Sequence, residues 1–126
     1  MTSIRRAIRW TAVVAVAALW IPAAAGPGAL AADPAPAVGE KLLLDNARVM
    51  VFEYTFPGGF RGEEHAAVAD EFAYVLDGQF TVVTRGQRPR VVRPGEIEYA
   101  AKGTVHTSLN EAASPARVLV VLVKER

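Results

Sequence analysis

The sequence predicts an all-β fold in which one small domain forms a β-barrel or jelly roll. From Lys41 onward, short runs rich in β-branched and aromatic residues alternate with turns that contain glycine or proline. Regular spacing of this kind is typical of all-β sandwiches and barrels. After the N-terminal segment, no stretch shows helical periodicity between capping residues. The predicted strands are residues 41–44, 48–56, 71–76, 79–84, 90–92, 96–99, 105–109 and 117–124.

Glycine marks most of the turns between these strands. Asp77-Gly78 lies between two of them. A two-residue Asp-Gly loop is a strong signal for a β-hairpin, because glycine accepts a positive φ at little steric cost. The sequence therefore predicts that strands 71–76 and 79–84 are joined as a hairpin.

The last predicted strand is apolar on both of its faces. The segment from Val118 to Val123 contains no polar residue, and a strand without polar alternation is normally covered on both sides. The core of the barrel provides one cover. For the other we expect a second subunit, which predicts a homodimer. The alternative is that the N-terminal segment covers this face.

The N-terminus has the three parts of a secretory signal peptide. Three arginines make it basic, an apolar run follows from residue 10 to 21, and small residues lead up to Ala31. We predict that residues 1–31 are a signal peptide, residues 32–39 a Pro-rich leader and residues 40–126 the barrel domain. The predicted location is the periplasm or the extracellular space. The alternative is an uncleaved membrane anchor, although a bilayer span needs ~20 strongly apolar residues.

Cleavage would change the charge of the protein. The full chain has a formal net charge of +1, and loss of Arg5, Arg6 and Arg9 lowers this charge to −2. A mildly acidic domain lacks the basic surface of nucleic-acid-binding proteins. The chain contains no cysteine, which excludes a disulfide framework and a thiolate site.

Both histidines of the chain lie in distinctive frames of glycines and polar residues. The first frame combines Gly59, His65, Glu71 and Gly78, and the second combines Gly95, Gly103, His106 and Asn110. With these residues at these spacings, the chain resembles the cupin family over residues 40 to 124. The resemblance implies a single cupin-like barrel, a double-stranded β-helix, with a divalent metal bound inside it.

The resemblance implies a metal site with a reduced set of ligands. His65, Glu71 and His106 match ligand positions of the family, whereas Ala67 stands in place of a further histidine and Ala101 in place of a proline. Two imidazoles and one carboxylate suit Fe, Mn, Ni or Zn and leave coordination positions open. The alternative is a buried hydrogen bond between histidine and glutamate without a metal.

Alternation along the strands predicts which neighbours share the interior with the ligands. If Glu71 points inward, then Ala73 and Val75 also point inward. By the same rule, if His106 points inward, then Thr104, Ser108 and Asn110 point inward too.

Two functions fit this site. One is a metal-dependent enzyme acting on a small molecule, for which the resemblance implies oxygenase, isomerase or decarboxylase chemistry; Glu63 or Glu64 is then a candidate for proton transfer. The other is a non-catalytic module that binds or senses a small molecule in the same pocket. A basic rim would steer an anionic ligand, although a solvated edge is the favoured interpretation. The rim consists of Arg85, Arg88, Arg90 and Arg93.

Overall fold

A computed structural model describes residues 37–126 of the chain. The predicted signal peptide lies outside the described residues, as does most of the predicted Pro-rich leader. Within the described part the chain forms strands and no helix, so it has no helix long and apolar enough to span a bilayer. The strands are β1 Gly39–Asp45, β2 Val49–Phe56, β3 His65–Ala66, β4 Asp70–Asp77, β5 Phe80–Thr84, β6 Arg90–Val92, β7 Ile97–Ala100, β8 Val105–Leu109 and β9 Ala116–Val123.

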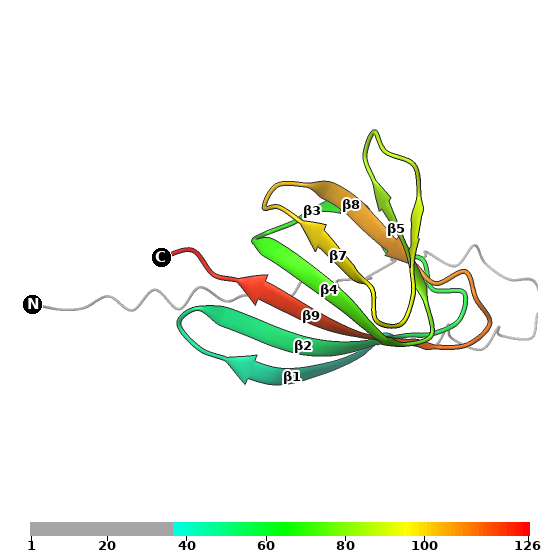
Figure 1. Ribbon diagram of the computed structural model, residues 1–126, viewed down its shortest axis with the longest axis horizontal. Helices are drawn as coiled ribbons and strands as arrows, with labels where there is room; N and C mark the ends of the chain where they lie inside the picture. Colours follow the sequence, from blue (N-terminus) through cyan, green and yellow to red (C-terminus); the bar gives the residue numbers. More distant parts are fainter. Residues whose placement is uncertain (1–36) are drawn as a thin grey trace, which may run out of the picture. The chain divides into compact units, whose positions relative to one another are not determined.

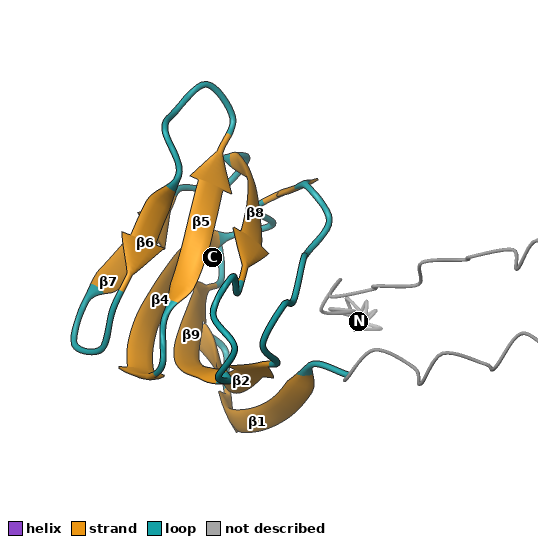
Figure 2. Cartoon of the chain, turned by 90° about the vertical axis from the view of Figure 1, so that its right-hand side faces the viewer, coloured by secondary structure: helices purple, strands orange, loops and turns teal. Residues whose placement is uncertain are grey.

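The strands form two antiparallel sheets that enclose one interior. The larger sheet has the order β1-β2-β9-β4-β7, and the smaller has the order β3-β8-β5-β6. Figures 1 and 2 show the smaller sheet facing the larger one. The prediction of an all-β barrel or jelly roll is therefore confirmed. All eight predicted strands are present; β3 was not predicted, because two residues are too few to show a pattern.

The predicted hairpin at Asp77-Gly78 is wrong. Strand β4 pairs with β7 and β9 in the larger sheet, while β5 pairs with β6 and β8 in the smaller one. Gly78 does have the expected positive φ, which is 71°. The φ of Gly59 is similar, at 77°. The backbone of Gly78 also passes so close to Pro115 that an added Cβ would lie 2.4 Å from the Pro115 carbonyl oxygen. The glycine permits a tight crossing between sheets rather than a hairpin.

One side of the interior is packed with aromatic rings. Alternate residues of β2 point inward, and Phe52, Tyr54 and Phe56 are all buried. The ring of Phe56 lies 5.0 Å from that of Phe60 and 6.2 Å from that of Phe80 on the opposite sheet. Such contacts join the two sheets and bury large apolar areas.

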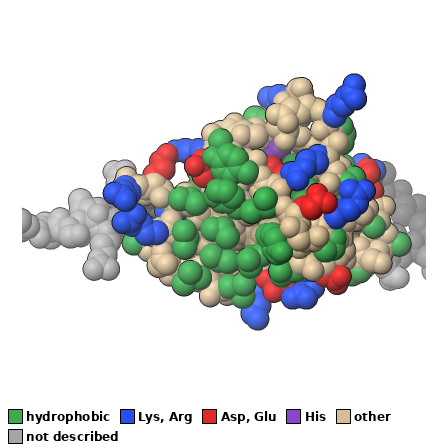
Figure 3. Space-filling model, viewed as in Figure 1, with side chains coloured by type: hydrophobic (Ala, Val, Ile, Leu, Met, Phe, Trp, Pro, Cys, Tyr) green, Lys and Arg blue, Asp and Glu red, His purple; other side chains and the backbone are tan. Residues whose placement is uncertain are grey.

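The outer face of the larger sheet is also apolar. Tyr74 on β4 and Ile97 and Tyr99 on β7 are 40%, 50% and 52% exposed. Figure 3 shows apolar side chains gathered where Figure 1 draws these neighbouring strands. On β9, Val118, Val120 and Leu122 are buried while Val123 is exposed. The homodimer stays a prediction.

Candidate metal centre

Three side chains with metal-binding atoms meet in the interior. Glu71 from β4, Glu98 from β7 and His106 from β8 each offer one ligand atom, and these atoms lie within 4.8 Å of one another. Two of the residues come from the larger sheet and the third from the smaller sheet. Closure of the two sheets therefore assembles a group that no local segment contains.

The strand pattern explains why Glu71 points into the barrel. It is followed by Ala73 and Val75, which are 4% and 0% exposed, as the predicted alternation requires. In the sheet Glu71 pairs with Ala100 on one side and with Leu122 on the other, and both partners are buried. The predicted inward orientation of this part of β4 is confirmed.

Sequence reasoning missed Glu98. It is 5% exposed, while its neighbours Ile97 and Tyr99 are 50% and 52% exposed, so β7 has its polar residue inside and its large apolar residues outside. Glu98 faces inward because it pairs directly with the buried Ala73. Alternation indicated that Ile97 and Tyr99 share a face, but ordinary hydrophobic patterning would place that face in the core.

His65 lies beside the group without belonging to it. It pairs in register with His106 across β3 and β8, so the two side chains project from the same face of the smaller sheet. Their ring centroids are 4.9 Å apart. The Nδ1 of His65 lies 3.0 Å from the carbonyl oxygen of Glu63. If Nδ1 carries the proton and donates it there, Nε2 is left as a potential ligand atom.

Burial controls the charges of the group. It raises the pKa of Glu98 to about 7, an effect that the Glu71 carboxylate reinforces and Arg90 opposes. Burial likewise raises the pKa of Glu71, with the nearby His65 acting in the opposite direction. For His106, burial lowers the pKa and His65 lowers it further. His106 is therefore a neutral imidazole at pH 7, the form that binds metals.

The ring nitrogens of His106 provide a test of whether a metal fits. The residue is 2% exposed, and neither Nδ1 nor Nε2 has a hydrogen-bond partner among residues 37–126. An unpartnered buried polar group is costly and rare. The alternative, a buried hydrogen bond between His106 and a glutamate, is therefore absent from the described residues. A buried imidazole facing two carboxylates is a donor set that fits a divalent cation.

The two alanines that depart from the motif occupy well-formed backbone positions. Ala67 is 3% exposed; its N–H donates to the carbonyl of Thr104, and its carbonyl accepts from the N–H of Gly103. The carbonyl of Ala101 accepts from Thr104 across the same turn. Replacement of proline by Ala101 thus leaves the turn intact, while Ala67 offers no ligand atom.

The remaining predicted residues lie elsewhere. Glu63 and Glu64 are exposed, and the Glu64 carboxylate forms an ion pair with Arg85. Asn110 is fully buried and donates to the carbonyl oxygens of Phe56 and Ser114 over 3.1 and 2.9 Å. This motif residue therefore ties loops together at the aromatic side and has a structural role.

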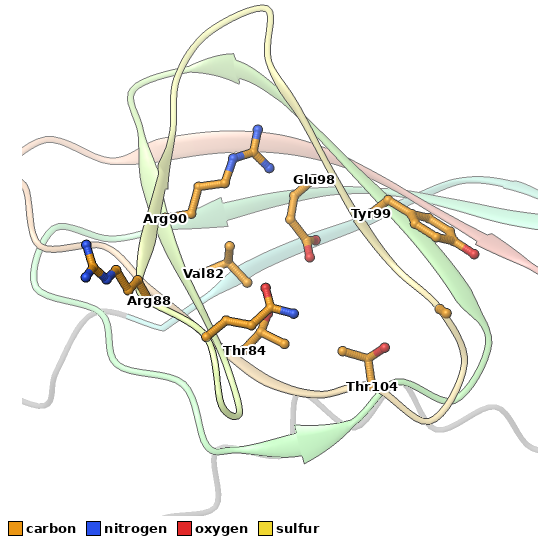
Figure 4. Close-up of a pocket in the computed structure, with 9 residues that line it drawn as sticks. Val82, Thr84, Arg88, Arg90, Glu98, Tyr99 and Thr104 are labelled. Carbon is orange, nitrogen blue, oxygen red and sulfur yellow. The ribbon is translucent and has the colours of Figure 1, made fainter.

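A pocket of about 280 Å³ opens beside Glu98. Figure 4 shows the carboxylate of Glu98 pointing into it, with Thr84 and Thr104 nearby and Arg90 above. The pocket lies between the edge strands β6 and β7 of the two sheets. A small molecule entering here would reach one member of the donor group directly.

The chain is similar to known proteins in sequence and in fold. A family model of the cupin domain matches residues 52–122. Comparison with curated proteins gives no match. Among solved structures, TT1209 from Thermus thermophilus has a TM-score of 0.63 and 27% identity, covering 71% of this chain and 85% of that protein. A cupin family protein with a double-stranded β-helix fold, from Methanocaldococcus jannaschii, has a TM-score of 0.64 and 17% identity over 69% and 80%.

A third similar structure carries the name of an enzyme. The DMSP lyase DddQ from Ruegeria pomeroyi has a TM-score of 0.64 and 19% identity, over 70% of this chain and 47% of that protein. At such identities the structures show a shared fold. The family model extends from β2 to β9 and includes all three residues of the donor group, Glu71, Glu98 and His106. This chain belongs to the cupin domain family.

Proposed function

We propose that the protein binds a divalent metal through Glu71, Glu98 and His106 and uses the site on a small organic molecule. The observation that carries the proposal is the buried imidazole of His106, which has no hydrogen-bond partner in the described part of the chain and faces two carboxylates. His65 remains a predicted ligand, because its ring lies next to that of His106. Glu98 supplies the third donor that Ala67 cannot.

The residues of the site have separate tasks. A bound divalent ion of the Fe, Mn, Ni or Zn type would supply Lewis-acid or oxygen-binding chemistry. Glu71 and Glu98 would balance its charge, and the carboxylate of Glu98 also faces the pocket. The carbonyl of Glu63 orients His65. The pocket beside Glu98 admits the organic molecule, and its walls position that molecule against the donor group.

Elemental analysis of the purified protein tests the metal site. We expect about one equivalent of metal per chain, reduced at least tenfold in both His106→Ala and Glu98→Gln because each change removes one of three donors. Glu63→Gln is the matched control, since this exposed carboxylate lies outside the group. Protein without metal, whose melting temperature is unchanged by added Fe, Mn, Ni or Zn, would contradict the proposal.

The alternative is a non-catalytic binding or sensing module. Ala67 favours this alternative, because a buried alanine stands where the family pattern has a further histidine and so removes one imidazole from the site. The enzyme proposal is supported by the likeness to a protein named as a lyase. The reactions that we propose for such an enzyme are oxygenase, isomerase or decarboxylase reactions. Turnover of a ligand that binds to the metal-loaded protein supports the enzyme, whereas reversible binding without any product supports the module.

We also propose that the protein is exported and loses residues 1–31. The basic, apolar and small-residue regions of the N-terminus support this proposal. N-terminal sequencing of the protein recovered from the periplasm or medium should begin close to Ala32. Recovery of the intact N-terminus in the membrane fraction would support the anchor instead.

A further inference from the structure

The pocket beside the donor group has an unusually polar lining. Strand β5 contributes Val82 and Thr84, the turn after it contributes Gln87 and Arg88, and β6 contributes Arg90 opposite Glu98. Ligand pockets are normally lined mainly by apolar side chains with a few polar ones. A pocket whose lining combines charged and hydroxyl side chains with apolar ones is suited to a small polar molecule.

We propose that this pocket selects a small carboxylate and that Arg90, assisted by Arg88, recognises its anionic group. The inference rests on the proposed metal site, because the ligand would lie between that site and the arginines. It extends the proposed function by naming the chemical class of the ligand and the residues that select it.

Arg90 is the principal anchor because the sheet and a neighbouring carbonyl hold it at the mouth of the pocket, where its side chain is 49% exposed. It pairs in register with Val82, whose side chain is 4% exposed and faces the interior. One N–H of its guanidinium donates to the carbonyl oxygen of Ile97 over 3.0 Å. The same guanidinium nitrogen also lies 3.8 Å from the Glu96 carboxylate. A guanidinium has five N–H donors, so these two contacts hold its position and still leave donors for a ligand. Planar paired donors match the two oxygens of a carboxylate.

Arg88 lies at the rim. Figure 4 shows its side chain turned outward, while that of Arg90 reaches over the pocket toward Glu98. The side chain of Arg88 is exposed and has no ion-pair partner among the described residues. Because a hydrogen bond to Ile97 holds Arg90 over the pocket whereas Arg88 is turned outward, we expect Arg88 to contribute less than Arg90.

A bound metal makes the balance of charge around the pocket more favourable to an anion. Without metal, the nearby carboxylates of Glu71, Glu96 and Glu98 offset the two arginines to the extent that they are ionised, which the raised pKa values of Glu71 and Glu98 reduce. A divalent cation adds positive charge beside the pocket and so favours an anion there. The volume of about 280 Å³ equals that of about nine water molecules, so the pocket suits a small ligand.

Calorimetric titration of the metal-loaded protein with succinate and succinamide tests the inference. The two probes have the same size, and only succinate is charged. We expect succinate to bind at least tenfold more tightly than succinamide, since charged hydrogen bonds exceed neutral ones by about that factor. Arg90→Gln should weaken succinate binding about tenfold and Arg88→Gln about threefold. The matched control Arg93→Gln, which removes an exposed charge outside the pocket, should change it less than twofold.

Metal content measured on the same samples separates the two proposals. Stoichiometric metal together with equal binding of both probes, no binding of either, or equal losses in Arg90→Gln and Arg93→Gln would overturn the inference and leave the metal site standing. Protein that takes up no metal would overturn both. Charge-selective binding that depends on metal and on Arg90 would support both.

Discussion

The two sides of the interior both join the larger sheet to the smaller one and differ in almost every property. On the β2 side, Phe52 and Phe56 are buried among other aromatic rings. On the β7 side, Glu71 and Glu98 are directed at an imidazole without a hydrogen-bond partner. One of the cross-strand rows that connect the two sides ends at the donor group, because Phe52 pairs with Val120, Val120 with Ala73 and Ala73 with Glu98.

This row shows how one small barrel separates stability from chemistry. Strand β9 lies between β2 and β4, and its buried valines insulate the polar side from the aromatic one. Burial of apolar area on the β2 side stabilises the fold, while the desolvated carboxylates and imidazole on the β7 side oppose it. A polar site of this kind is tolerated because the other half of the core is large.

The largest expected effect is on the aromatic side. Phe56→Ala should destabilise the protein by about 3–5 kcal/mol, since it removes a buried ring from contacts with both sheets. Denaturant unfolding would measure this loss, and metal content per folded chain should stay unchanged. Phe72→Ala is the matched control, because Phe72 is only half-buried and its ring contacts Tyr99, which is exposed. A larger loss in Phe72→Ala would show that the core does not lie where we place it.

An intermediate effect is expected on the polar side, where a buried carboxylate opposes folding once it is ionised. The folded-state pKa of Glu98 is raised from 4.5 to about 7, so its contribution to stability is complete below the unfolded pKa and is lost as the pH rises through about 7. The metal-free protein should therefore lose roughly 2 kcal/mol of unfolding free energy between pH 4.5 and pH 8. Denaturant unfolding in the presence of a chelator at several pH values measures this dependence.

Substitution of the carboxylate isolates its share of that loss. In Glu98→Gln most of the decline should disappear, and the metal-free variant should be more stable than the unchanged protein at pH 8. Glu63→Gln, which alters an exposed carboxylate, should retain the full decline. If Glu98→Gln is instead less stable at pH 8, burial of this carboxylate does not oppose folding.

The smallest effect on folding is expected outside the barrel. We propose that the apolar outer face around Tyr74, Ile97 and Tyr99 contacts a second copy of the chain, because large exposed apolar patches mark interaction sites. Ile97→Lys should shift a dimer to a monomer in sedimentation experiments while changing stability by about 0.5 kcal/mol or less. Val68→Lys, an exposed change outside the strands, should leave the dimer intact. A monomeric unsubstituted protein at high concentration would refute the dimer.

The sequence by itself determined the local features of this protein. Runs of β-forming residues between glycine turns located eight strands, and the frames around His65 and His106 identified the family. Alternation along β4 correctly grouped Glu71 with Ala73 and Val75 on the buried face. These features depend on neighbouring residues and on the two-residue period of a strand, so a sequence displays them directly.

Only the tertiary structure decided which strands pair and which face of each lies inside. Alternation tells that Glu98 and Ala100 share a face, but pairing with the distant β4 turns that face inward and exposes Ile97 and Tyr99. The same long-range pairing separates β4 from β5 despite the turn at Gly78 between them. Cross-strand contacts join residues far apart in the chain, and their energies depend on the whole closed barrel rather than on any local segment.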